Sequence, residues 1–143
     1  MKRVSGMTLL VAAGIGLLLA PQAVHAQVCS DEVSMIDASK QTLVELTERV
    51  KKESLLAFER SNEQKSAVNK LGIHISMLGE LVSCLDKAAQ DSTASKADVE
   101  AAKGRRDAAA RLLEKIQHQQ SGIKNAKDSK GAKDLIEKLD LTS

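Results

Sequence analysis

Residues 64–89 decide the fold, and they read QKSAVNKLGIHISMLGELVSCLDKAA. Apolar side chains recur in this stretch at alternating spacings of three and four residues, as on one face of an α-helix. A strip beside that seam holds only glycine and serine, and small side chains let a neighbouring helix approach closely. Because the helix is apolar on more than one side, we expect it to lie between two other helices in a bundle. The seam consists of Val68, Leu71, Ile75, Leu78, Val82 and Leu85, and the small strip of Gly72, Ser76, Gly79 and Ser83.

The same helix is a poor candidate for a membrane span. Its apolar part is about 15 residues long, whereas a span needs roughly 20. It also contains His74 and Glu80, and ionisable side chains are costly inside a bilayer. We therefore predict that the chain has no membrane span once its N-terminal segment is removed.

A helix is predicted on each side of this one. The first runs from Ser30 or Asp31 to about Glu59, and a turn follows at residues 60–63, where Ser61 or Asn62 is suited to cap the next helix. Its apolar stripe consists of Ile36, Leu43, Leu46, Val50 and Ala57.

The third helix is predicted over residues 96–120, after a polar loop. The sequence from Ser95 to Asp98 resembles a capping box, with Asp in place of the usual Glu or Gln, and Gly122 is suited to end the helix. A Lys-rich linker over residues 123–131 and a short amphipathic helix follow. The apolar residues are Val99, Ala102, Ala109, Leu113 and Ile116 in the third helix, and Leu135, Ile136 and Leu139 in the last.

These elements predict an all-α fold: a small three-helix bundle, made of a helical hairpin and a third helix, with a short C-terminal helix. The predicted divisions are 1–26 for a signal peptide, 27–122 for the bundle, and 123–143 for the linker and last helix. The alternative is one unbroken heptad helix over residues 29–85 that dimerises as a coiled coil. The hairpin is favoured, because a coiled coil tolerates one or two polar seam residues. The single register would hold five, namely Lys40, Thr47, Ser54, Ser61 and Gln64.

The first 26 residues have the parts of a secretory signal peptide. Lys2 and Arg3 form a positive region, residues 7–20 (MTLLVAAGIGLLLA) are apolar, and residues 24–26 suit a signal peptidase. The alternative is an uncleaved N-terminal anchor, but the apolar part is shorter than a span. We predict a Sec-type signal peptide that is cleaved after Ala26, which places the protein in a bacterial periplasm or outside the cell.

The exported chain keeps two cysteines, Cys29 and Cys84. An even count in an oxidising compartment predicts a disulfide; a redox pair, a metal-binding pair and free thiols are the alternatives. A hairpin that turned near Ser61 would place Cys84 opposite Lys40, about 16 Å from Cys29 along the helix. The bond therefore requires the N-terminal segment to fold back, or the turn to lie nearer residue 57.

The composition excludes several classes of function. The chain has one Phe and no Trp or Tyr, whereas sugar clefts, base-stacking platforms and cation cages use aromatic rings. Without the signal peptide, 19 basic side chains balance 19 acidic ones, so no net charge attracts nucleic acid. We predict no nucleic-acid partner.

The sequence also lacks recognisable catalytic motifs, including a nucleophile elbow, an H-E-x-x-H pair and a glycine-rich phosphate loop. His74 has no potential ligand one helical turn away, and we interpret it as a structural histidine. His118 shares a helix face with Glu114, but two ligands do not make a zinc site. We therefore predict a protein that is not an enzyme and that binds no cofactor or metal.

Two features are candidates for contact with a partner. Lysines 124, 127, 130 and 133 are spaced by three and would gather positive charge on one side of a helix, although a solvated linker is the favoured interpretation.

Leu55, Leu56 and Phe58 point in different directions near the end of the first helix, so they are the predicted partner-binding residues. The alternative is that the C-terminal apolar residues Leu135, Ile136, Leu139 and Leu141 cover them.

No motif in the chain selects a family. The favoured function is contact with another envelope or secreted protein, as an adaptor, an inhibitor or a component of a secretion or envelope apparatus. The alternatives are a periplasmic stress-type chaperone (a holdase) and an envelope structural protein that self-associates through the seam of residues 64–89.

Overall fold

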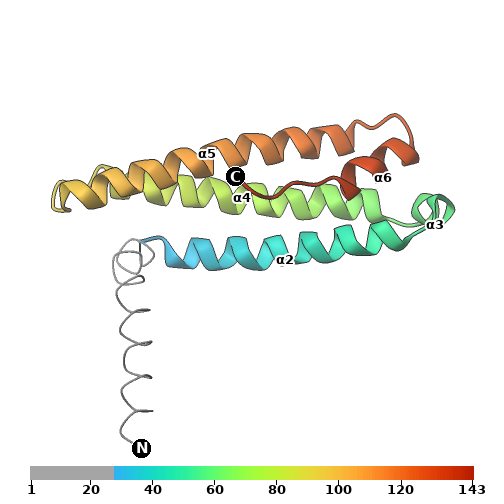
Figure 1. Ribbon diagram of the computed structural model, residues 1–143, viewed down its shortest axis with the longest axis horizontal. Helices are drawn as coiled ribbons and strands as arrows, with labels where there is room; N and C mark the ends of the chain where they lie inside the picture. Colours follow the sequence, from blue (N-terminus) through green and yellow to red (C-terminus); the bar gives the residue numbers. More distant parts are fainter. Residues whose placement is uncertain (1–27) are drawn as a thin grey trace, which may run out of the picture.

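The computed structural model of the chain describes residues 28–143, so the predicted signal peptide lies outside the described residues. This part of the chain forms five α-helices and no strand, which confirms the predicted all-α fold. The long helices α2, α4 and α5 lie side by side, and the short helices α3 and α6 lie at one end of the bundle (Figure 1). The helices are α2 (Ser30–Lys52), α3 (Leu55–Arg60), α4 (Glu63–Ala89), α5 (Lys96–Lys124) and α6 (Ser129–Glu137).

Helix α4 lies between α2 and α5, as its sequence predicts (Figure 1). Its seam residues Leu71, Leu78 and Leu85 are buried. Beside the seam, a Cβ at Gly72 would lie 3.3 Å from the Gln120 side chain of α5, so the small residue leaves room for a helix contact. The other three seam residues, Val68, Ile75 and Val82, are half-buried.

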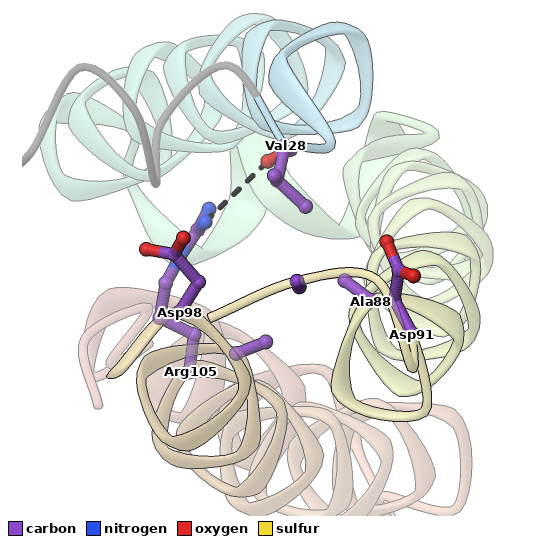
Figure 2. Close-up of a pocket in the computed structure, with 7 residues that line it drawn as sticks. Val28, Ala88, Asp91, Asp98 and Arg105 are labelled. Carbon is purple, nitrogen blue, oxygen red and sulfur yellow. Dashed lines mark hydrogen bonds between the residues drawn. The ribbon is translucent and has the colours of Figure 1, made fainter. Parts of the chain in front are cut away.

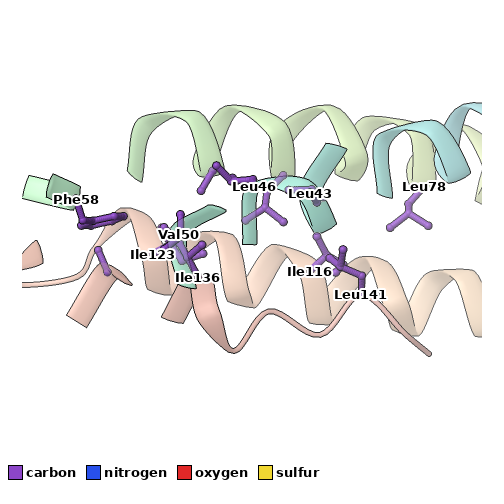
Figure 3. Close-up of a cluster of buried hydrophobic side chains, with 12 residues drawn as sticks. Leu43, Leu46, Val50, Phe58, Leu78, Ile116, Ile123, Ile136 and Leu141 are labelled. Carbon is purple, nitrogen blue, oxygen red and sulfur yellow. The ribbon is translucent and has the colours of Figure 1, made fainter. Parts of the chain in front are cut away.

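The larger buried cluster joins all five helices and the C-terminal tail (Figure 3). A smaller cluster lies around the disulfide and includes Cys29, Leu81, Leu85 and Ala109. The larger cluster consists of Leu43, Leu46, Val50, Phe58, Ala67, Leu71, Leu78, Ile116, Ile123, Ala132, Ile136 and Leu141.

Three contacts between α2 and α4 define their register. In each pair the two residues lie symmetrically about residues 56–57, which is therefore where the hairpin turns. Of the two ways to form the disulfide, the structure uses the turn nearer residue 57. The pairs are Cys29 with Cys84 (Sγ–Sγ 2.00 Å), Ser39 with His74 (Oγ–Nδ1 2.5 Å) and Arg49 with Glu63 (Nη2–Oε2 3.0 Å).

The first helix ends earlier than predicted. It stops at Lys52 and not near Glu59, because Glu53 and Ser54 both have extended backbones. The Ser54 side chain then accepts a hydrogen bond from the Ala57 amide (3.1 Å) and caps α3. This break also contradicts the unbroken helix over residues 29–85, whereas the second interruption, at residues 61 and 62, lies where the turn was predicted.

The third helix ends later than predicted. It continues to Lys124, so Gly122 lies inside the helix and is not its C-cap. One more turn buries Ile123, whose carbonyl accepts a hydrogen bond from the Gln64 side chain (2.9 Å). The predicted linker is correspondingly shorter, because α6 begins at Ser129, where Asp128 caps it.

The C-terminal tail after α6 packs back onto the bundle. Leu141 is buried in the larger cluster. Asp140 pairs with the Lys115 ammonium, and its amide and carbonyl bond the side-chain amide of Gln119 at 2.8 Å and 2.9 Å. The Lys115 hydrogen bond, and then those from Thr142, hold the pKa of Asp140 well below its usual range.

We expect Phe58→Ala to lower the free energy of unfolding by about 3–5 kcal/mol, because it empties a buried site between α3 and α6. Leu56→Ala, two residues away at an exposed position, should change it by less than about 0.5 kcal/mol. Urea unfolding followed by circular dichroism measures both values. Equal losses for the two variants would contradict the burial of Phe58.

Candidate functional site

The candidate site is the end of the bundle formed by α3. Leu55 and Leu56 are 40% and 55% exposed there, and we call these two residues the tip leucines. Phe58 must be removed from the predicted partner-binding set, because it is only 3% exposed. It packs in the core with Ala132 and Ile136 of α6.

The C-terminal helix therefore covers only part of this end. Ile136 and Leu141 are buried and Leu139 is half-buried, whereas Leu135 stays exposed. The sequence left two alternatives for these residues, a partner-binding surface or burial under the C-terminal apolar residues. Burial under α6 holds for Phe58, whereas the tip leucines remain exposed. A six-residue helix that begins at Ser54 and is anchored by Phe58 presents both leucines to solvent.

Charged side chains surround the tip, and some of them are paired. Arg49 of α2 pairs with Glu63 of α4 at 3.0 Å, which ties the two helix ends together below α3. One carboxylate oxygen of Glu53 is buried with no hydrogen-bond partner in the described part of the chain.

The four lysines do not share one helix face, because they are divided among elements. Lys124 ends α5, Lys127 lies in the connection, and Lys130 and Lys133 belong to α6. Lys133 pairs with Glu137, and the other three are exposed. The alternative of four ammonium groups gathered along one helix therefore does not hold.

His74 is a buried polar residue, 1% exposed, in the middle of the hairpin. Ser39 Oγ has one proton, which it donates to the Ile36 carbonyl (3.0 Å). The Ser39–His74 contact therefore has His74 Nδ1–H as its donor, and Nε2 carries a lone pair with no partner among the described residues. Burial, and then the charge of Lys40, lower the pKa of His74 and keep the ring neutral. This geometry does not suit a nucleophile, because the Ser39 proton is already donated to the backbone.

The hollows of the described part of the chain are either small or open to solvent. The one in Figure 2 lies where the start of α2 meets the end of α4 and the first turns of α5, and it measures ≈110 Å³. Arg105 Nη1 donates to the Val28 carbonyl at its edge (3.4 Å). Ligand pockets usually enclose roughly 300–1,000 Å³. Three larger hollows, beside Lys124 (≈350 Å³), Val44 (≈340 Å³) and Ile73 (≈450 Å³), are open grooves that no histidine lines.

No family model, no curated protein and no solved structure matches the chain. Within residues 28–143, no helix combines the length and the hydropathy that a membrane crossing requires.

Sequence reasoning missed two contacts of this structure. Ser39 and His74 are 35 residues apart, and no local pattern links them until the register of the hairpin is known. The bonds of Lys115 and Gln119 to the C-terminal tail are likewise invisible, because residues 138–142 have no helical period.

Protonation of His74 should make stability fall in mild acid. The folded-state pKa lies below that of the unfolded chain, so the unfolded chain takes up the proton first as the pH drops below about 6.5. We expect the free energy of unfolding to decrease from pH 7 to pH 5, by at most about 1.4 kcal/mol per pH unit.

His74→Gln should remove this dependence, and the exposed variant His118→Gln should retain it. Urea titrations at a series of pH values provide the slope. A His74→Gln protein with an unchanged slope would show that another group causes it.

Proposed function

We propose that the protein is an exported, non-enzymatic helical protein that works by contact with another envelope or secreted protein, as an adaptor, an inhibitor or an apparatus component. The disulfide between Cys29 and Cys84 fits an oxidising compartment. Together with the signal sequence over residues 1–26, it supports export to a bacterial periplasm or the exterior, with cleavage after Ala26.

The exposure of the tip leucines is the observation that carries this proposal. Other large exposed apolar residues, such as Met35, Val44 and Ile73, are spread singly along the long helices, which is normal for a soluble surface. The tip leucines are adjacent in sequence and occupy the end of an elongated bundle (Figure 1). Apolar residues on one face of a helix can dock in a hydrophobic groove of a partner.

The support under the tip leucines favours a binding role over local disorder. Phe58 is buried against α6, Ser54 caps the helix, and the Arg49–Glu63 pair joins the helices below it. A surface that is ordered before binding loses less entropy when it meets a partner. The tip is thus both apolar and held in place.

The test is affinity capture of the tagged protein from the envelope of its native cells, after crosslinking, with mass spectrometry. We expect one dominant partner, and we expect Leu56→Asp to reduce its recovery about tenfold or more, as for a hot-spot residue. Circular dichroism should show unchanged helicity, because position 56 is exposed.

Val44→Asp is the matched control, since Val44 is 46% exposed on the side of α2 and away from the tip. It should capture the partner as the wild type does. Equal recovery with Leu56→Asp and the wild type would exclude the tip as the binding surface.

A second candidate, an acid-responsive holdase, is favoured by the groups that titrate. His74 loses its stabilising contribution below about pH 6.5. The Asp140 contact is complete above the usual Asp pKa, near 3.9, and is lost as the pH falls from there towards the folded-state pKa. Both changes loosen the middle and the tail of the bundle in acid.

If the holdase interpretation is right, binding of a hydrophobic dye should rise as the pH is lowered from 7 to 3. The rise should begin at a lower pH in His74→Gln, which cannot take up the proton. A flat response in the wild-type protein would remove this candidate.

A further inference from the structure

A glutamate lies beside the disulfide at the end of the bundle opposite the tip. Glu32 follows Cys29 by three residues in the first turn of α2, and Cys84 comes from α4. The two sulfur atoms and one carboxylate oxygen of Glu32 all lie within 4.8 Å of one another. Three atoms that could bind a cation, two of them joined in the disulfide, therefore lie close together.

The Glu32 carboxylate has no hydrogen bond or ion pair in the described part of the chain, although the residue is half-buried. An acidic residue in a first turn stabilises the helix N-terminus, and the exposed Asp31 in the same turn does so equally. The helix dipole thus explains a negative charge in this turn, but not its placement against two sulfurs.

Two thiolates and a carboxylate are a typical ligand set for a soft or borderline divalent cation. Zn²⁺ binds cysteine sulfur and carboxylate oxygen in tetrahedral sites, where water fills a position that the protein leaves open. We propose that Cys29, Cys84 and Glu32, in the dithiol form of the protein, bind one such cation, Zn²⁺ or Cd²⁺. The metal and the disulfide are then alternative crosslinks between α2 and α4.

The two forms interconvert by a balanced exchange. An external dithiol donates two electrons to the Cys29–Cys84 bond, which opens to two thiols while the reductant closes to its own cyclic disulfide. Binding of the cation then releases both thiol protons to solvent. The bound site carries three negative ligand charges against two positive charges of the metal.

The crosslink also holds Cys29 in an unusual backbone conformation. Cys29 has φ 65°, the only positive φ of a residue other than glycine in residues 28–143. A residue with a Cβ rarely adopts this region, because its Cβ comes close to the following carbonyl oxygen, so its surroundings must hold it there. In the proposed dithiol form the cation holds Cys29 and preserves the register of α2.

The experiment uses purified protein that is reduced with dithiothreitol, desalted without oxygen and titrated with Cd²⁺, with Zn²⁺ as competitor. The ultraviolet sulfur-to-cadmium absorption reports binding clearly, because the chain has no Trp or Tyr. We expect one ion per chain, no such band in the oxidised protein, and an affinity about 10–100-fold weaker in Glu32→Gln.

Asp31→Asn is the matched control, because it removes an equal charge from the same helical turn at an exposed position. It should bind Cd²⁺ as the wild type does. The proposal is overturned if Glu32→Gln binds as tightly as the wild type, or if Asp31→Asn weakens binding to the same extent. If reduction melts the helices, addition of Zn²⁺ must restore the circular dichroism signal, and failure to do so also overturns it.

Discussion

The disulfide between Cys29 and Cys84 and the hydrogen bond between Ser39 and His74 hold α2 against α4 in one register. Closing a loop of this length removes about 4 kcal/mol of conformational freedom from the unfolded chain. The buried hydrogen bond adds specificity, because a shift of one residue would separate two buried polar groups and leave them unpaired. Once this register is set, the hairpin has to turn at residues 56–57, and α3 becomes its end.

That position of α3 explains why a short apolar segment can be both ordered and exposed. Two extended residues before it and one after it turn the six-residue helix out of line with α2 and α4. Phe58 then points into the cluster that α6 completes, and the leucines at 55 and 56 are left outside. The apolar residues of the C-terminus are used mainly to bury one aromatic ring and close the core.

The parts of the fold that the sequence predicts are those with a long, regular period. Residues 64–89 show three-four spacing over seven turns, and the helix and its central place follow from it. The end of α2 was not predictable in this way, because its only local signal is Ser54, and serine also occurs inside the long helices of this chain, as at Ser66 and Ser83. At Gly122 the local signal was misleading: burial of Ile123 stabilises one more turn and outweighs the preference of glycine for a helix end. For the candidate site, sequence identified the exposed pair of leucines but grouped Phe58 with them, since a surface and a core side chain on one short helix have the same periodicity.

The two ends of the molecule are therefore stabilised in different ways. At one end a covalent bond fixes the register, and at the other end packing against α6 supports the tip. Between them lies His74, the one buried histidine among residues 28–143, where the structure tolerates an unpaired nitrogen only while the ring is neutral. We expect acid to protonate His74 in the middle of the hairpin and Asp140 in the C-terminal tail. A dithiol would instead reduce the disulfide at the crosslinked end. Neither agent acts directly on α3, because Phe58 and the Ser54 cap depend on apolar packing and a backbone hydrogen bond. The tip can thus keep its form while the register below it is loosened, and under the proposed function this separation would let the bundle present the same apolar contact to its partner in both states.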